Sequence, residues 1–475
     1  MSLSRRNFLR NAAATTTAFT ALSALSGCGP RRFDGNYASQ VRGFGPLYRD
    51  RNGLLDLPRD FTYQVISETG REMSDGLLTP GDFDGMAAFP GDDGNIVLVR
   101  NHELWPGQTD VSAFGPDAAR LDRIDRSRVW DYLPTGAPQL GGTTNVILNA
   151  ETLRVEREFM SLAGTYNNCA GGPTPWGSWL TCEETIEPAG ENAGRDHGYV
   201  FEVPSSANGL VEPLALRGMG RFMHEAVAID PRTGIAYQTE DHFGGPALFY
   251  RFIPDHPGEL WRGGRLQGLV VRGQPGKDMR NWDGSERVNT NEWLDVDWMD
   301  LEDIDNPDGD IAPRHIAQGA AHFTRGEGCW YGGEGEVYFT TTDGGLLQSG
   351  QIWRYRPSPA EGTTGETSQP GQIQLFVESE DTNVLQWVDN ITFAPWGDLI
   401  VVEDGPNDQY IRGVTPEGQV YTIAHNADGG DDNSFSEFCG PCFSPDGTTM
   451  FVNVQKNPGR TFAIRGPWDR RSLQS

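Results

Sequence analysis

A hairpin-like unit recurs six times along the chain, and this repeat constrains the fold more than any other feature. Each copy has a short apolar strand, a turn rich in Pro, Gly and Asp, and a second strand of β-forming residues, as in "DNITFAPWGDLIVVEDG". A two-sheet sandwich gives no reason for six similar hairpins, whereas a propeller repeats one unit per blade. We therefore predict an all-β, six-bladed propeller with long inter-strand loops and a central metal-lined channel. The copies occupy residues 83–103, 168–184, 224–242, 326–345, 389–405 and 437–455.

The segments between the hairpins predict outer strands and long loops. Strand-like runs that would complete four-stranded blades occur at 198–204, 247–254, 350–356 and 418–424. The main loops are predicted at 104–140, 255–315 and 357–371, the second with room for a short helix. The expected organisation is a signal peptide, an N-terminal segment or linker, and a single propeller domain, at 1–27, 28–60 and 61–465.

The N-terminus carries export signals. Consecutive arginines in "SRRNFLR" precede a weakly apolar run, which resembles a twin-arginine signal, and "LSGC" resembles a lipoprotein cleavage box. Together they predict a mature chain that begins at a lipidated Cys28, with an ordinary cleavage nearby as the alternative. The expected location is the periplasm or cell surface. The twin-arginine export machinery is then a partner, and membrane contact is through the lipid anchor alone.

The charge balance excludes some classes of binding partner. Asp and Glu number 66 and Lys and Arg 38, a formal net charge of −28. This argues against nucleic acid and against anionic lipid surfaces as partners. Mutual repulsion of so many carboxylates would be relieved by bound polyvalent cations, although a solvated acidic surface explains most of the charge. We expect a monomer.

The cysteines add a constraint. Five cysteines remain apart from Cys28, and an odd number of cysteines outside the cytoplasm leaves at least one thiol unpaired. A Cys439–Cys442 disulfide across "GP" is one open alternative. Cys182 and Cys329 lie within or beside apolar strands, where core packing is favoured over chemistry. Among the histidines, His197 is predicted to be a surface or loop residue. Apart from Cys28, the cysteines are Cys169, Cys182, Cys329, Cys439 and Cys442.

Hairpin geometry predicts where the candidate functional residues lie. The first residue of the first strand and the last residue of the second lie side by side at the same end of a hairpin. Asp389 and Asn390 should therefore meet Glu403 and Asp404, and Cys169 should meet Glu183 and Glu184. By the same rule His224 and Glu225 meet Glu240 and Asp241. In a propeller these ends converge on one mouth of the channel.

A ring of carboxylates with one thiol predicts a metal site of mixed character. Carboxylates suit hard cations such as calcium, whereas the thiolate of Cys169 favours iron, zinc or copper. Arg325 in "FTRGEGCW" would bring a guanidinium suited to phosphate to the same mouth. No serine nucleophile elbow and no phosphate-cradling Gly-Lys-Ser/Thr loop occurs, so a metal-bound oxygen is the expected nucleophile of phosphoryl transfer.

The sequence resembles the PhoX-type alkaline phosphatases over roughly residues 60 to 460. The resemblance rests on "NCAGGPTPWGSWLTCEE", "RFMHEAVAIDPRTGIAYQTED", "RGEGCWY" and "DNITFAPWGDLIVVEDG", together with "NHE", "GQIWRY" and "GPCFSPDGTTMFVN". It implies a twin-arginine-exported, six-bladed propeller that hydrolyses phosphate esters with ferric iron and calcium. Cys439 has no place in the family pattern.

The resemblance also implies roles for particular residues. Cys169 and Glu225 would hold iron, Glu184 and Glu327 would bridge or hold iron and calcium, and Arg325 would grip the phosphate. Arg325, Cys169 and Glu225 are thus the expected catalytic residues, and His102 is a second expected substrate-binding residue. The other expected metal ligands, without assignment to an ion, are Asn101, Glu103, Glu240, Asp241, Glu403 and Asp404.

Two alternatives differ in class. A calcium-dependent lactonase or esterase-type propeller hydrolase would need few channel ligands and neither Cys169 nor Arg325. A non-enzymatic, lipid-tethered propeller adaptor would have an open channel poor in carboxylates and an apolar patch on one face. The coincidence of Cys169, Glu184, Glu225, Arg325 and Glu327 favours the phosphatase over both.

Overall fold

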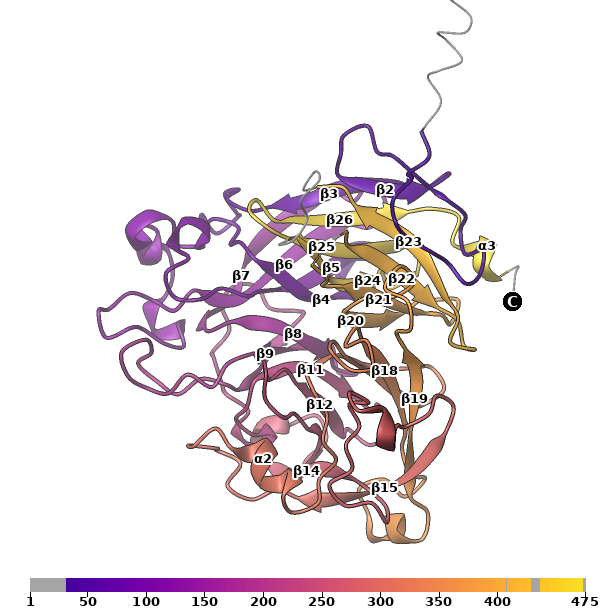
Figure 1. The fold of residues 1–475 in the computed structure, drawn as a ribbon. Helices are drawn as coiled ribbons and strands as arrows, with labels where there is room; N and C mark the ends of the chain where they lie inside the picture. The colour runs from indigo at the N-terminus through magenta and orange to yellow at the C-terminus, as the bar shows by residue number, and fades with distance from the viewer. Residues whose placement is uncertain (1–30, 407, 429–435, 473–475) are drawn as a thin grey trace, which may run out of the picture.

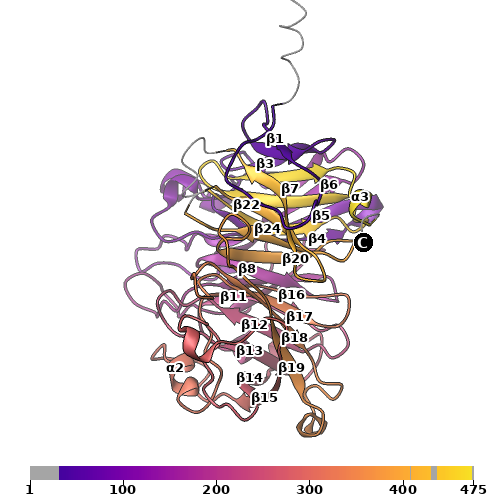
Figure 2. The same ribbon diagram turned by 45° about the vertical axis from the view of Figure 1, so that its right-hand side comes forward.

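The computed structural model describes residues 31–406, 408–428 and 436–472, and Cys28 lies outside this part of the chain. The described chain is mostly β, with antiparallel sheets in a propeller-like arrangement (Figures 1 and 2). Helices are short, with α2 at Ile311–Ile316 and α3 at Asp469–Ser472. Among the described residues, none of the helices has the length and apolarity needed to cross a membrane.

The first predicted hairpins each begin a meandering sheet. The sheet β4–β5–β6–β7 consists of Phe83–Pro90, Asn95–His102, Gly141–Asn149 and Val155–Thr165. The sheet β8–β9–β10 consists of Asn168–Pro173, Ser178–Glu183 and Val200–Pro204. The predicted outer run at 198–204 is therefore confirmed as β10.

Two further meanders share one nine-stranded sheet. Its first half is β11–β12–β13–β14, at His224–Ile229, Ala236–Glu240, Phe249–Pro254 and Gly264–Val271. Its second half, from the inside outward, is β16–β17–β18–β19, at Gly326–Tyr331, Val337–Thr341, Gln351–Arg356 and Gly371–Glu378. The strand β15, Trp293–Asp300, pairs with β14 on one side and β19 on the other and joins the halves.

The segment 255–315 is more ordered than the sequence predicts. It was expected to be a loop with a short helix, yet it contains β14 and β15 as well as α2. The sequence of β15, "WLDVDWMD", is hard to recognise because this outer strand is buried mainly at Val296 and presents acidic side chains to solvent. The loop prediction is wrong for these two strands.

The last two sheets use strands from both ends of the chain. The fourth is β20–β21–β22–β23, at Val388–Phe393, Leu399–Glu403, Tyr410–Val414 and Val420–Asn426. The fifth is β24–β25–β26, at Glu437–Phe443, Thr449–Gln455 and Arg460–Arg465, and β3, at Thr62–Glu68, pairs with β26. An N-terminal strand thus completes the sheet formed by the C-terminal strands, which closes the arrangement.

The first strands of the meanders form a closed ring. In chain order β4, β8, β11, β16, β20 and β24 each contact the next, and β24 contacts β4. Figures 1 and 2 show β4, β8 and β20 near the middle of the molecule and β3 and β15 toward its outside. Apolar side chains fill the space between neighbouring meanders; Phe249 of β13 and Phe339 of β17, for example, stack between the two halves of the nine-stranded sheet with their ring centroids 4.0 Å apart. All hairpin mouths at one end therefore face a common centre.

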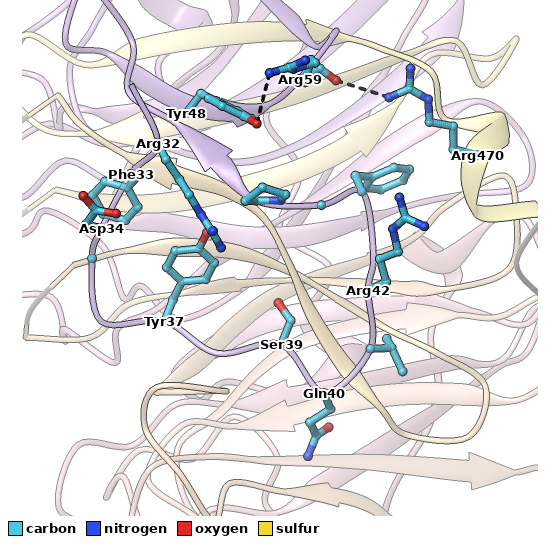
Figure 3. A pocket seen from close by; sticks show the side chains of 15 residues that line it. Arg32, Phe33, Asp34, Tyr37, Ser39, Gln40, Arg42, Tyr48, Arg59 and Arg470 are labelled. Carbon is cyan, nitrogen blue, oxygen red and sulfur yellow. Dashed lines mark hydrogen bonds between the residues drawn. The ribbon is translucent and has the colours of Figure 1, made fainter. Parts of the chain in front are cut away.

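The N-terminal segment packs against the sheet that contains β20–β23. Within residues 28–60, expected as a segment or linker, β2 (Leu55–Pro58) pairs with β23, and β1 (Leu47–Tyr48) pairs with β2. This pairing covers a sheet edge that would otherwise expose backbone hydrogen-bonding groups. A hollow of about 910 Å³ lies beside this segment. Figure 3 shows the side chains of Arg32, Arg42, Arg59 and Arg470 around it.

Candidate metal centre

Every inner hairpin carries the same irregularity. In the first, Phe83 pairs with His102 and Met86 with Arg100, so the first strand advances three residues while the second advances two. The inner hairpins of the other meanders repeat this shift, starting at Asn168, His224, Gly326, Val388 and Cys439. A β-bulge of one residue bends the strand and re-aims a side chain. The repeated bulge thus turns one residue per hairpin toward the centre.

The bulge residues supply most of the candidate ligands. The residue after the start of the shift is Asp84, Cys169, Glu225, Glu327 or Asp389 in five hairpins and Gly440 in the sixth. At Gly440 φ is +58°, and an added Cβ would lie 2.5 Å from the carbonyl oxygen of Asp84, so a side chain has no room there. In that hairpin Glu437, at the start of β24, lines the cavity instead.

The second strands contribute another set, at the residue that follows the strand. Glu103, Glu184, Asp241 and Asp404 each come directly after the last residue of a second strand and line the cavity. Thr342 holds this place after β17 and donates a hydrogen bond of 3.0 Å to Glu327. Because successive side chains point to opposite sides, the preceding residues face away from the cavity.

This alternation separates the predicted acidic pairs. In Glu240–Asp241 and Glu403–Asp404 only the second residue lines the cavity. Glu240 accepts hydrogen bonds from the Tyr250 hydroxyl (2.5 Å) and the Leu248 amide (3.2 Å), and burial raises its pKa to about 7. Glu403 is ion-paired with Arg412 over 2.9 Å. Both were expected as metal ligands, yet here they are held by protein partners inside their sheets.

Asn101 and His102 also lie outside the cavity lining. The Asn101 amide donates to the carbonyls of Cys169 and Ala170, at 2.7 Å each, and its oxygen accepts from Trp179 at 2.8 Å. His102 is fully buried; its Nδ1 donates to the Gly81 carbonyl, and its Nε2 lies 2.9 Å from the Thr144 hydroxyl. Asn101 therefore positions the strand that carries Cys169, and His102 has no ring nitrogen left for substrate.

The ring encloses a cavity of about 250 Å³. Around it the described residues place eight carboxylates, one thiol, one guanidinium, one amide and one aromatic ring. They are Asp84, Glu103, Cys169, Glu184, Asp241, Phe243, Arg325, Glu327, Asp389, Asp404, Glu437 and Gln455. Gln455 donates to Glu103 over 2.8 Å and to Asp84 over 2.9 Å.

Three overlapping groups have a geometry suited to cations. Within each group the ligand atoms lie within 4.8 Å of one another. Cys169 is shared by the first two groups and Glu225 by the last two, so the groups form a chain of neighbouring sites. Two groups combine sulfur with oxygen, and the third offers oxygen alone, which matches a mixture of softer and harder ions. The groups are Asp84–Glu103–Cys169, Cys169–Glu184–Glu225 and Glu225–Glu327–Asp389.

The protonation behaviour of these groups also indicates cations. Burial, followed by the charges of Glu327 and Glu184, raises the pKa of Glu225 well above its ordinary value, and its Oε2 has no hydrogen-bond partner among the described residues. Desolvation, followed by the charge of Asp84, likewise raises the pKa of the Cys169 thiol. Bound cations would reverse both effects by stabilising the deprotonated ligands. The donor set therefore fits a metal cluster.

Arg325 lies at the same cavity, and hydrogen bonds to two carboxylates hold its guanidinium in place. Its Nε and Nη2 donate to Asp241 at 3.0 and 2.8 Å, and Nη2 also donates to Glu327 at 2.8 Å. Burial lowers its pKa, but the charges of Glu327 and Asp241 outweigh burial and hold the pKa above its ordinary value. Its φ of +28° is rare for a residue with a side chain. Nη1 makes no hydrogen bond to the described residues and remains available to a ligand.

A buried network behind Glu184 was missed from the sequence. His197, read as a surface or loop residue, is fully buried; its Nδ1 lies 2.7 Å from Glu183 and its Nε2 3.1 Å from Asp131. Burial opposes protonation, but the two carboxylates raise the pKa of His197 to about 9. The ring is therefore protonated on both nitrogens and positively charged at neutral pH. Glu183 also accepts the Tyr166 amide at 3.0 Å. This network fixes the strand end from which Glu184 projects.

Other cavity residues were absent from the expected metal ligands, although hairpin geometry had already placed Asp389 at the mouth and the hairpin alignment holds a signal for Asp84 and Glu437. Asp84 and Asp389 occupy the bulge position of Cys169 and Glu225, and Glu437 begins the sixth hairpin. Phe243 and Gln455 carry no signal of metal chemistry in the sequence.

The other cysteines are structural. Cys182, Cys329, Cys439 and Cys442 are buried free thiols, and the described chain contains no disulfide, so the Cys439–Cys442 alternative is not realised. Cys439 donates a hydrogen bond to the Phe83 carbonyl, with Sγ 2.7 Å from the oxygen. It packs behind the first hairpin and does not line the cavity.

The fold and the cavity together define a β-propeller protein with a central, carboxylate-rich site of the kind that binds cations and a single arginine among the described lining residues. The family model described as "Alkaline phosphatase PhoX" matches residues 42–459. The chain belongs to the PhoX alkaline phosphatase family and is accordingly a phosphoric ester hydrolase.

One solved structure has a similar fold, and others match more loosely. The Pseudomonas fluorescens PhoX in complex with vanadate, described as a transition state analogue, is 17% identical, with a TM-score of 0.64 over 92% of this chain and 98% of that chain. Looser matches include a putative gluconolactonase, 10% identical over 88% of this chain and 95% of that chain, with a TM-score of 0.40. Another is the Xanthomonas campestris gluconolactonase XC5397, 13% identical over 91% of this chain and all of that one, with a TM-score of 0.38. No curated protein matches the chain.

Proposed function

We propose that this protein is an extracytoplasmic, metal-dependent phosphatase that hydrolyses phosphate esters and releases inorganic phosphate at the central cavity. The observation that carries the proposal is the placement of Arg325. Its Nη1 is available to a ligand, and it lies at the same cavity as three overlapping groups of metal-type ligands. A cavity that combines cation ligands with one oriented guanidinium suits a phosphoryl group, whose oxygens carry negative charge.

We assign softer and harder ions by donor chemistry. The group Cys169–Glu184–Glu225 includes a thiolate ligand and would hold ferric iron, whereas Glu225–Glu327–Asp389 offers oxygen alone and would hold calcium. The group Asp84–Glu103–Cys169 would extend the cluster. When bound, such ions polarise the phosphorus–oxygen bonds and lower the pKa of water.

The chain's own residues hold the substrate in place. Nη1 of Arg325 would donate to phosphoryl oxygens, while Asp241 and Glu327 keep the guanidinium from rotating. A planar group fixed before the substrate arrives loses little freedom on binding. In the reaction the bond from phosphorus to the alcohol oxygen breaks, and a bond from phosphorus to a water oxygen forms. Arg325 would stabilise the charge on the phosphoryl oxygens throughout.

We interpret the architecture as six blades in one domain. The nine-stranded sheet is then two four-stranded blades joined at their outer edges through β15, and β3 with β24–β26 forms the closing blade. The closed ring of β4, β8, β11, β16, β20 and β24 supports this count. The propeller domain would extend over 61–465.

We also propose export by the twin-arginine route and lipidation at Cys28, as the "SRRNFLR" and "LSGC" segments indicate. A protein that folds around metals before export needs a route for folded chains. Mass spectrometry of the mature protein should find an N-terminus at Cys28 that carries a lipid. An unmodified N-terminus upstream or downstream of Cys28 would remove the anchor from this proposal.

Calcium removal tests the proposed function. Treating the purified protein with a calcium-selective chelator should abolish hydrolysis of an aryl phosphate, because the uncompensated carboxylates would then repel each other and the substrate. Added calcium should restore activity, while elemental analysis finds iron bound throughout. Full activity in the chelator would contradict the proposal. Hydrolysis of lactones in place of phosphate esters would favour the lactonase-type alternative.

A further inference from the structure

Exposed aromatic side chains follow two of the cavity carboxylates at the same spacing in the sequence. Phe243 comes two residues after Asp241 and is 70% exposed, and Trp105 comes two residues after Glu103 and is 45% exposed. The same place after Glu184 and Asp404 is held by Ile186 and Pro406, which are also apolar. Large apolar side chains are rarely left so exposed without a binding role when they cluster at a cavity. Of these residues, Phe243 is the one that lines the cavity.

Phe243 is coupled to the proposed phosphate ligand. It lines the cavity, and the guanidinium carbon of Arg325 lies 3.9 Å from its ring centroid. A cation over the face of an aromatic ring is attracted by the electron density of that face. Because the ring is still largely exposed, the face away from Arg325 can contact a ligand. A phosphate held by Nη1 of Arg325 would place the attached alcohol beside this ring.

Trp105, on the loop that follows Glu103, is held in place by its neighbours. Its ring packs edge-on against Tyr166, with centroids 5.4 Å apart, and its backbone amide donates to Gln108 over 2.6 Å. An aromatic side chain that is already ordered costs little conformational entropy when it binds a ligand. Trp105 thus offers a second prepared apolar surface on the loop that leaves Glu103.

The charge of the cavity limits the substrates that suit this rim. Eight carboxylates and one arginine line it among the described residues, so a leaving group with further negative charge would be repelled even where cations neutralise part of the site. A flat, uncharged alcohol would instead gain contact with Phe243. Aromatic groups stack with ring centroids about 4.5–7 Å apart and gain about 0.5–1.5 kcal/mol beyond burial.

We propose that Phe243 is a specificity-determining residue, and that the preferred substrates are phosphate esters of aromatic or otherwise apolar, uncharged alcohols. This inference rests on the proposed phosphatase function. The alcohol group stacks on the exposed face of Phe243 while Arg325 holds the phosphate. Phe243 acts on binding of the leaving group, and its removal leaves the metal ligands in place.

Inhibition by two non-hydrolysable phosphonates separates the roles of Phe243. In Phe243→Ala the inhibition constant of phenylphosphonate should rise about 3- to 10-fold, the ratio that an aromatic contact of this size gives, while that of methylphosphonate changes less than about twofold. Phe243→Tyr, which keeps the ring, should retain the parental preference. The matched control Trp261→Ala removes another exposed aromatic, 59% exposed on the loop between β13 and β14, and should change neither constant.

Two other results would overturn the proposal. An equal rise for both phosphonates would mean that Phe243 acts only by holding Arg325, and no rise for either would mean that the ring contacts no ligand. If the wild-type protein hydrolyses no phosphate ester, the proposed function fails. Calorimetric binding of the two phosphonates to the metal-loaded protein then still decides whether Phe243 recognises the phenyl group.

Discussion

Cys169→Ser is expected to lose bound iron and to retain less than about one hundredth of the parental activity toward an aryl phosphate. A serine hydroxyl stays protonated at neutral pH and is a poor ligand for iron, whereas a thiolate is a strong one. Two of the three ligand groups contain Cys169, so a single atom change disturbs both. Losing even an outer-shell partner commonly costs about 10- to 100-fold, and a direct ligand should cost more. Elemental analysis and initial rates measure the two effects.

Cys439→Ser is the matched control for this substitution. Cys439 is a buried thiol among the same carboxylates, but it donates to the Phe83 carbonyl and does not line the cavity. A serine hydroxyl can keep that hydrogen bond, so iron content and activity should stay close to those of the parent. Hydrolysis by Cys169→Ser at the parental rate would show that the thiol is not a ligand needed for the reaction.

Arg325→Lys is expected to keep its metals and to lower turnover by about 10²-fold or more. Removal of one preorganised charge donor commonly costs about 2.7–4 kcal/mol in the barrier. An ammonium group has no planar fork, so it cannot pair with Asp241 and Glu327 and also present a second nitrogen to the phosphate. Steady-state kinetics should show the loss mainly in kcat, with iron and calcium contents unchanged.

Chemical rescue distinguishes the guanidinium from its charge. Added guanidinium should partly restore Arg325→Ala, because the space beside Asp241 and Glu327 remains, whereas added ammonium should not. Arg262→Lys, on the outer loop between β13 and β14, serves as the control and should behave as the parent. Parental turnover in Arg325→Lys, or loss of iron as in Cys169→Ser, would refute the assigned role.

The repeat made much of the fold predictable. Alternating strands and Gly/Pro/Asp turns placed all six hairpins and the four outer strands, because these local signals agree with the tertiary structure. The strands β14 and β15 were not predicted. The acidic, partly exposed sequence of β15 lacks the usual apolar alternation, whereas β14, "GRLQGLVV", is mostly buried and lay within a segment that was assigned as a loop. The number of blades depends on how nine hydrogen-bonded strands are divided, which local sequence does not determine.

The candidate site was predictable in outline but not in detail. Hairpin geometry brought Cys169, Glu184, Asp241, Arg325 and Glu327 to one mouth, as the structure has them. It did not decide which member of an acidic pair faces the centre, because that depends on which face of the second strand is turned inward, and the two members point to opposite sides.

Partners from distant loops were beyond sequence reasoning. His197 is charged only because Asp131, 66 residues earlier, and Glu183 enclose it. Phe243 lines the cavity with Arg325, 82 residues later in the chain, over its ring. Such contacts are set by tertiary packing, so neither residue differs in its local sequence from an ordinary loop residue.

X-ray absorption at the iron edge of the purified, metal-replete protein tests the central claim most directly. The account predicts bound iron with a sulfur neighbour among otherwise oxygen ligands, and the loss of that iron signal in Cys169→Ser. Protein that contains no iron, or iron surrounded by oxygen and nitrogen alone, would contradict the assignment of the cavity as a mixed thiolate and carboxylate metal centre.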